Sequence, residues 1–180
     1  VLEATGQEAQ VVFLSDHGEM LGEKGLWFKM SFFEGSARVP MVISAPGLAP
    51  GLVEDPVSTI DLTPTLCDLA GVSMAEVMPW TDGESLVPLA KGTPRSSPVA
   101  MEYAAEGSIT PLVALRQGAW KYTRCNADPE QLYDVANDPG ERVNLAGDPR
   151  AAKVMEHFRH IADQRWDLDA YDAEVRQSQA

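Results

Sequence analysis

The feature that most constrains this chain is a short apolar run, residues 11–14, that ends abruptly in polar residues and a glycine. Four consecutive apolar side chains bounded by a turn are typical of a buried strand. In open α/β sheets, ligands bind beyond the carboxyl ends of the strands. Asp16 and His17 stand at that end, and both a carboxylate and an imidazole can bind a divalent cation. The run therefore predicts one wall of a metal site.

A simpler interpretation of the same residues is a turn. Asp and Gly are common turn residues, so residues 15–18 could form a turn in which Asp16 caps the next segment. Short motifs often match by chance, and each dipeptide taken alone favours the turn. Lys29, further along the chain, adds a compact positive charge that could hold an anionic oxygen. A metal next to a cation favours a site for a phosphate or sulfate ester.

The wider sequence resembles a known family. Residues 15–29, SDHGEMLGEKGLWFK, resemble the second signature of the sulfatase family, within the alkaline phosphatase superfamily, and residues 31–46 continue the match. Residues 102–107 and 166–169 resemble choline sulfatases in particular. The resemblance extends over residues 9–179. It implies a sulfuric ester hydrolase that acts on choline-O-sulfate or a similar small alkyl sulfate.

The nucleophile of that family has no counterpart in the chain. Sulfatases use a formylglycine made from the first residue of a Cys/Ser-x-Pro-x-Arg motif, and neither Cys67 nor Cys125 stands in such a motif. The paired N-terminal aspartates of the family's metal site are missing as well. We therefore expect the chain to be the C-terminal portion of the enzyme, inactive without the part that supplies the nucleophile.

Two other functions stay open at this point. The first is a phosphomonoesterase or phosphonate hydrolase of the same superfamily, in which the same metal and lysine would serve a phosphoryl group. The second is a fragment without catalytic activity that binds a metal or another protein.

The resemblance implies roles for individual residues. Asp16 and His17 would be ligands of a Ca²⁺ ion, with Mg²⁺ or Mn²⁺ as alternatives because an imidazole is an unusual ligand for calcium. His17 is also a catalytic candidate, as a hydrogen-bonding neighbour of the sulfate. Lys29 would bind a sulfate oxygen and act in catalysis by stabilising the leaving group.

Recognition of a trimethylammonium group calls for aromatic faces and carboxylates. The candidate carboxylates for substrate binding are Glu106, Asp167 and Asp169. The last two lie in an amphipathic tail, residues 166–180, whose apolar side chains have no obvious place within their own subdomain. The tail could pack on a neighbouring protomer of a homo-oligomer and lend that protomer a carboxylate, although a frayed C-terminal helix fits the sequence equally well.

The expected fold class is α/β: the C-terminal part of a doubly wound alkaline-phosphatase-like domain over residues 1–92, followed by a small α+β subdomain over 98–180 that carries the oligomerising tail. Hydrophobic periodicity and turn residues predict the elements. In the first part these are strands at 11–15 and 39–45 and helices at 59–70 and 85–90. In the second they are strands at 99–103, 112–116, 119–124 and 132–134 and a helix at 148–166.

Composition excludes several classes of function. The net charge of −13 argues against nucleic-acid binding, which requires a basic face. No apolar run approaches the roughly 18 to 20 residues of a membrane span. The two cysteines support no disulfide framework, which favours a cytoplasmic location.

We expect two pairs of polar residues to have structural roles and no part in catalysis or metal binding. Glu34 and Arg38 stand four apart and are expected to form an ion pair that orders the segment after Lys29. His157 and His160 are expected to be exposed on the C-terminal helix, because no third metal ligand is nearby.

Overall fold

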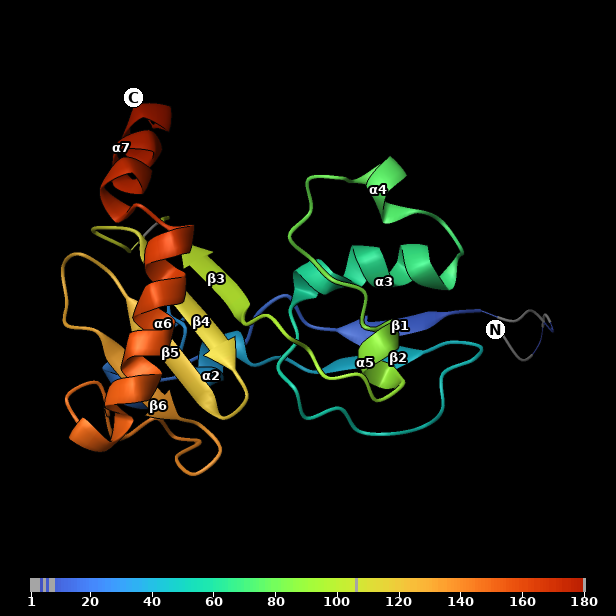
Figure 1. The fold of residues 1–180 in the computed structure, drawn as a ribbon, viewed down its shortest axis with the longest axis horizontal. Helices are drawn as coiled ribbons and strands as arrows, with labels where there is room; N and C mark the ends of the chain where they lie inside the picture. The colour runs from blue at the N-terminus through green and yellow to red at the C-terminus, as the bar shows by residue number, and fades with distance from the viewer. Residues whose placement is uncertain (1–3, 5, 7–8, 106, 180) are drawn as a thin grey trace. The chain divides into compact units, whose positions relative to one another are not determined.

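The computed structural model describes residues 4, 6, 9–105 and 107–179. The chain divides into two compact units (Figure 1). The first unit consists of Val1–Asp16 and Val39–Ser97, and the second of His17–Arg38 and Pro98–Ala180. The predicted domain ranges, 1–92 and 98–180, stay predictions about the whole enzyme.

The first unit contains a two-stranded antiparallel sheet. Strand β1 (Val11–Leu14) pairs with β2 (Met41–Ser44), so both strands lie where they were expected. The expectation that β1 is buried was wrong, because the Phe13 side chain is 64% exposed. Successive side chains of a strand point to opposite faces, and one face of this sheet remains exposed in the first unit.

The helices of the first unit begin and end at recognisable signals. A short 3₁₀ turn, Thr59–Asp61, leads into α3 (Leu62–Leu69), as predicted. Ser58 and Asp61 form a capping box at its start, in which Asp61 Oδ2 accepts from Ser58 N at 2.8 Å. Gly71 follows α3 with φ +68°, the left-handed conformation that suits a glycine after a helix. Over residues 9–16 and 39–97, this unit also contains the helices α4 (Met74–Val77) and α5 (Val87–Ala90).

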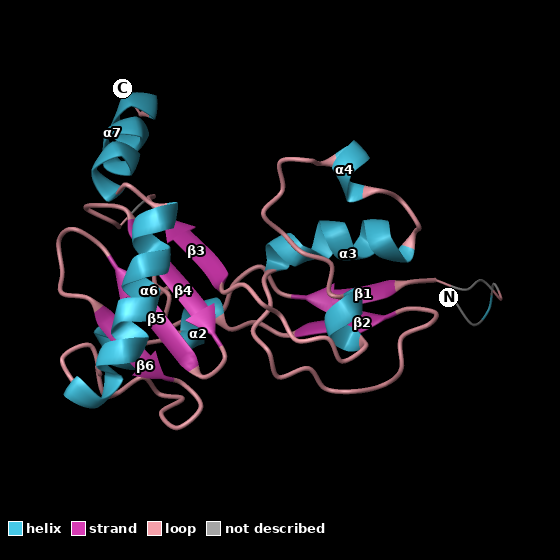
Figure 2. Cartoon of the chain, in the orientation of Figure 1, coloured by secondary structure: helices cyan, strands magenta, loops and turns pink. Residues whose placement is uncertain are grey.

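The second unit is built on a four-stranded antiparallel sheet (Figure 2). Its strands lie side by side in chain order, and each overlaps a predicted strand within one residue at either end: β3 (Val99–Tyr103), β4 (Leu112–Gln117), β5 (Trp120–Arg124) and β6 (Gln131–Asp134). Gly118, with φ +51°, lies in the tight turn between β4 and β5. Consecutive antiparallel strands need only such short connections, so hairpin patterns in the sequence predicted this sheet well.

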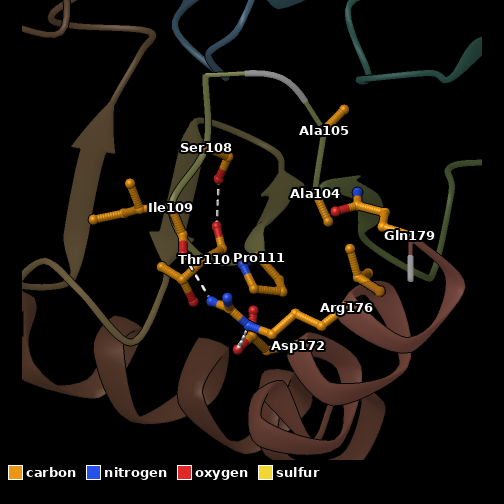
Figure 3. A pocket seen from close by; sticks show the side chains of 10 residues that line it. Ala104, Ala105, Ser108, Ile109, Thr110, Pro111, Asp172, Arg176 and Gln179 are labelled. Carbon is orange, nitrogen blue, oxygen red and sulfur yellow. Dashed lines mark hydrogen bonds and ion pairs between the residues drawn. The ribbon is translucent and has the colours of Figure 1, made fainter.

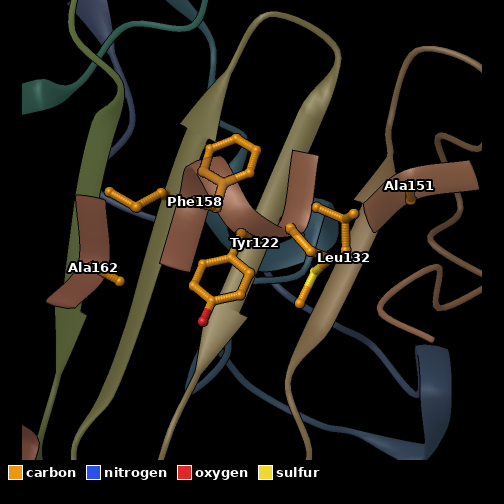
Figure 4. Close-up of a cluster of buried hydrophobic side chains, with 7 residues drawn as sticks. Tyr122, Leu132, Ala151, Phe158 and Ala162 are labelled. Atoms are coloured by element: carbon orange, nitrogen blue, oxygen red, sulfur yellow. The ribbon is translucent and has the colours of Figure 1, made fainter. Parts of the chain in front are cut away.

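A long helix covers one face of this sheet (Figures 1 and 4). The 3₁₀ turn Pro149–Ala151 leads into α6 (Ala152–Arg165), and Asp148 caps it by accepting from Arg150 N at 2.8 Å, as expected. The Tyr122 ring of β5 stacks on Phe158 of α6, with 5.8 Å between ring centres. The buried cluster between helix and sheet consists of Leu115, Tyr122, Leu132, Ala151, Met155, Phe158 and Ala162.

The opposite face of the sheet carries the segment that contains α2 (Glu34–Ala37) and the 3₁₀ turn Glu23–Gly25 (Figure 1). Side chains alternate along a strand, so neighbours of residues that face α6 must face this segment. Tyr133 follows Leu132 in β6, and its ring centre lies 6.1 Å from that of Phe33. The sheet is therefore covered on both faces.

The C-terminal tail packs within its own unit, which corrects an expectation. Helix α7 (Leu168–Ser178) follows α6 directly, and the Leu168 side chain is only 4% exposed. Trp166 packs against the buried cluster, and its Nε1 donates to Glu102 Oε1 at 2.7 Å. The expectation that these side chains have no place in their own subdomain was wrong, because β3 and the end of α6 provide one.

Within the described residues, no helix is both long and apolar enough to cross a membrane. The two histidines on α6 are exposed, as expected. His157 Nε2 lies 3.0 Å from the side-chain oxygen of Gln117.

We expect Phe158→Ala to lower the free energy of unfolding by about 3 to 5 kcal/mol, because it removes a fully buried ring and leaves a cavity against Tyr122. Urea denaturation followed by circular dichroism measures this. The control, His160→Ala on the exposed face of the same helix, should change stability by less than about 0.5 kcal/mol. Equal losses in the two variants would contradict the assignment of the core.

Candidate functional site

Residues 17–38 form a closed loop in the second unit, called here the Lys29 loop. Its two ends are joined by backbone hydrogen bonds: Gly18 N donates to Ser36 O at 2.7 Å, and Glu19 N donates to Gly35 O at 2.8 Å. Position 18 requires glycine, because a Cβ there would lie 2.2 Å from Gly35 O. The two ends of the loop are therefore held together independently of the conformation of its tip.

The tip of the loop is ordered by further backbone hydrogen bonds, and it contains a residue in a strained conformation. Met20 N donates to Phe28 O at 2.9 Å, and Gly22 N donates to Leu26 O at 2.8 Å. Phe28, directly before Lys29, has φ +69°, a conformation that a non-glycine residue seldom adopts. Such strain persists only where the surrounding structure over-determines the conformation, and it concentrates at functional sites.

Lys29 has a fixed main chain and an exposed side chain. Its carbonyl oxygen accepts from Ser36 Oγ at 2.5 Å and from Ser31 N at 2.8 Å. Within the described part of the chain, no carboxylate pairs with its ammonium group. A compact cation on a rigid base, open to solvent, can meet an anionic ligand.

Asp16 and His17 lie two and three residues beyond the end of β1. The Asp16 side chain is exposed, and His17 is half-buried. His17 Nδ1 lies 2.8 Å from Gly18 O. A carbonyl oxygen can only accept, so Nδ1 carries the proton, and in the neutral ring the lone pair is on Nε2. A carbonyl partner on one ring nitrogen is the usual arrangement of a metal-binding histidine.

The donor set fits a divalent metal only in part. Among the described residues, no three side chains of His, Cys, Asp or Glu gather into a group that could hold a metal ion. Calcium takes about six to eight oxygen ligands, of which Asp16 can supply one or two. Asp16 and His17 would therefore need ligands from outside this set, and their roles stay predictions.

Two predicted substrate-binding carboxylates have local partners. Asp167 Oδ1 accepts from the backbone N–H groups of Asp169 and Ala170, at 3.1 and 3.0 Å, and so caps α7. Asp169 Oδ1 accepts from Asn126 Nδ2 at 2.7 Å. Both side chains are exposed, and their proposed contact with substrate stays a prediction. The third candidate, Glu106, lies outside the described residues.

The predicted ion pair between Glu34 and Arg38 was wrong. Glu34 Oε1 instead lies 2.7 Å from the Nζ of Lys121, a residue to which no sequence pattern assigned a role. The only signal in the sequence was a charge in the middle of a predicted strand, and half-exposed strands carry such charges commonly.

Arg116 lies opposite Lys121 in the β4–β5 pair. Burial lowers the pKa of Arg116, while the carboxylates of Glu34 and Glu141 act in the opposite direction. Two cations side by side would repel each other, and two carboxylates next to them offset that repulsion.

A separate hollow of about 400 Å³ lies between α7 and the connection from β3 to β4 (Figure 3). Arg176 is the cation that lines it. Its Nε is 2.7 Å from Asp172 Oδ2, and its Nη2 donates to Ile109 O at 3.3 Å. A guanidinium that is already paired attracts a further anion weakly, so the hollow adds nothing to the candidate site.

Comparison with known proteins gives consistent matches. Residues 22–166 match the family model described as N-sulphoglucosamine sulphohydrolase, C-terminal. The chain is 58% identical to a choline-sulfatase of Rhizobium meliloti (strain 1021), over 94% of this chain and 34% of that protein. It is 35% identical to a Delta 4,5-hexuronate-2-O-sulfatase of Bacteroides thetaiotaomicron, over 88% of this chain and 34% of that protein.

A solved structure shares the fold. The phosphonate monoester hydrolase of Agrobacterium radiobacter aligns with a TM-score of 0.73 at 30% identity, over 95% of this chain and 37% of that one. The chain thus spans about a third of the length of the proteins it matches.

We expect Asp16→Ala, in an enzyme that carries this chain, to abolish turnover and lower the content of bound divalent metal. Measured without added metal, the free energy of unfolding should change by less than about 0.5 kcal/mol, because the side chain is exposed. Metal analysis and urea denaturation measure the two effects, with Glu76→Ala, an exposed carboxylate of α4, as the control. Normal metal content in the Asp16 variant would show that Asp16 is no ligand.

Proposed function

Because this chain belongs to the sulfatase family, we propose that it forms the C-terminal part of a sulfuric ester hydrolase whose active site includes Lys29. The observation that carries the proposal is the 58% identity with a choline-sulfatase over 94% of the chain. Its fold is that of the C-terminal part of an alkaline-phosphatase-like enzyme, an α/β segment followed by an antiparallel sheet with a helix. The formylglycine nucleophile would come from a part of the enzyme outside this chain.

Lys29 would act on the sulfate group. Its ammonium is a strongly hydrated point charge that suits a sulfate oxygen, and charge grows on the departing ester oxygen as the bond breaks. The bonds from Ser36 and Ser31 to the Lys29 carbonyl hold the base of the side chain in place before substrate arrives. This prepositioning supports a role in the transition state.

Asp16 and His17 would hold the divalent metal, Ca²⁺ by resemblance, together with ligands from the rest of the enzyme. When bound, the metal would neutralise charge on the sulfate oxygens and orient the nucleophile. The hydrogen bond at Nδ1 keeps the His17 ring in the tautomer that a metal ligand needs.

We propose choline-O-sulfate as the substrate, on the strength of the choline-sulfatase relative. Asp167 and Asp169 are exposed at the start of α7 and could present carboxylates to a quaternary ammonium. In a homo-oligomer, as the resemblance implies, that substrate would be bound by a neighbouring protomer. A cytoplasmic location fits the two cysteines, Cys67 and Cys125, which are both free thiols.

A second candidate is a phosphonate or phosphate monoester hydrolase. The structural likeness to a phosphonate monoester hydrolase favours it, because the same cation and metal suit both ester types. A higher kcat/KM for a phosphonate monoester than for sulfate esters, measured on the complete enzyme, would establish this candidate over the first.

We expect Lys29→Ala to lower kcat by several orders of magnitude and to raise KM by much less, because the cation matters most when charge develops in the transition state. Steady-state kinetics of sulfate release from choline-O-sulfate measures both constants. Lys91→Ala, which removes another exposed lysine, is the matched control and should leave both unchanged. A change confined to KM would mean that Lys29 assists only ground-state binding.

A second test addresses the recognition of choline. The double variant Asp167→Ser, Asp169→Asn removes two charges, while Ser preserves the cap of α7. We expect KM for choline-O-sulfate to rise by about ten- to a hundredfold, the equivalent of roughly 1 to 3 kcal/mol. KM for an aryl sulfate without a cationic group should hardly change.

The matched control for this test is Glu174→Gln, which removes an exposed charge from the same helix. Equal losses for the two substrates would refute the recognition role and leave Asp167 and Asp169 with their structural contacts alone.

A further inference from the structure

One buried lysine of the sheet holds the far end of the Lys29 loop. Lys121, in β5, is 1% exposed. Its Nζ donates to Phe32 O and to Glu34 Oε1, both at 2.7 Å. The same nitrogen lies 2.6 Å from Glu141 Oε1. The ammonium group thus makes two hydrogen bonds to the loop, and its contact with Glu141 Oε1 is an ion pair without hydrogen-bond geometry.

Glu141 connects the same loop at two further points. Its side chain is 2% exposed, and its Oε2 accepts from Glu34 N at 2.7 Å. Its carbonyl oxygen accepts from the Lys24 ammonium, which also lies 4.5 Å from the centre of the Phe33 ring. A single residue beyond β6 therefore contacts both the tip of the loop and the start of α2.

The contacts reach Lys29 through one short helix. Lys121 and Glu141 hold Glu34, the first residue of α2. Ser36, in the same helix, is buried and donates its hydroxyl to the Lys29 carbonyl at 2.5 Å. A shift of α2 must therefore shift the main chain of Lys29.

Stability alone does not account for these charges. Replacing a buried ion pair with apolar side chains is often neutral or stabilising, because the loss of hydration offsets the attraction between the charges. Directional hydrogen bonds from an ammonium group fix the position of the loop more precisely than apolar packing does. Glu141 itself has φ +49°, an unusual conformation that its contacts with the loop help to maintain.

We propose that Lys121, Glu34 and Glu141 are positioning residues that set the placement of Lys29 for the reaction. This inference rests on the proposed function, since it assumes that Lys29 acts in catalysis. Small displacements of a catalytic group by substitutions away from the chemistry can lower the rate by about a hundredfold.

The test uses the complete enzyme with two variants. Lys121→Met leaves two carboxylates without their cation and could prevent folding. The double variant Lys121→Met, Glu141→Gln removes both charges and keeps an oxygen that can accept from Glu34 N, so it preserves more of the fold. The control is Glu130→Gln, which removes a charge from the ion pair with Arg159 in the same unit and keeps an oxygen that can accept from Tyr122.

Two readouts are needed. In the double variant, kcat for choline-O-sulfate should fall by about 10- to 100-fold while KM stays within about threefold. Hydrogen exchange at the amides of Gly18, Glu19 and Met20 should become at least about tenfold faster, because the loop opens more often. The control should change neither quantity once kcat is corrected for the folded fraction.

The outcomes separate the two proposals. A kcat within about twofold of the unmodified enzyme, or unchanged exchange in the loop, would overturn the positioning role. A loss of kcat as large in Glu130→Gln would do the same, because it would reflect general loosening of the unit. If the unmodified enzyme hydrolyses no sulfate ester, the proposed function fails, and the exchange data alone decide whether Lys121 and Glu141 position the loop.

Discussion

The charge cluster around Lys121 is the interaction on which the placement of the Lys29 loop depends. Lys121 joins β5 to the Lys29 loop and to Glu141, three segments that are far apart in the sequence. Removing one partner of a buried ion pair typically costs about 3 to 5 kcal/mol, because the other charge stays buried without compensation. A small unit can therefore keep this cluster only if all its members are present together.

The alternation of side chains in β5 explains how one sheet serves two purposes. Tyr122 points to α6 and contributes to an apolar core, while its neighbour Lys121 points to the opposite face and holds the loop. The apolar face supplies most of the stability, because burial of hydrocarbon is the dominant favourable contribution to folding. The charged face fixes the position of the Lys29 loop through directional contacts. A rigid platform on one side is what allows a polar arrangement on the other to be precise.

The tail shows how packing can change the meaning of a sequence pattern. Apolar residues at 166 and 168 had no obvious place within their own subdomain, so a neighbouring protomer could have covered them, or the helix could have been frayed. In the structure Trp166 and Leu168 pack within their own unit, and Asp167 caps the helix that follows. The carboxylates at the start of α7 nevertheless remain exposed. A contribution to a neighbouring active site would therefore rest on those charges and not on these two apolar side chains.

The sequence by itself determined the local elements and the family. Asp148, Gly71 and the hairpin turn at Gly118 act within a few residues of their own position, so propensity and periodicity were sufficient to place helices and strands. Only the tertiary structure decided the partner of Glu34, which is Lys121 and not Arg38. The physical reason is that a helical spacing of four residues permits an ion pair between Glu34 and Arg38 but does not require one. The buried ammonium group of Lys121 requires carboxylate partners, and Glu34 and Glu141 provide them.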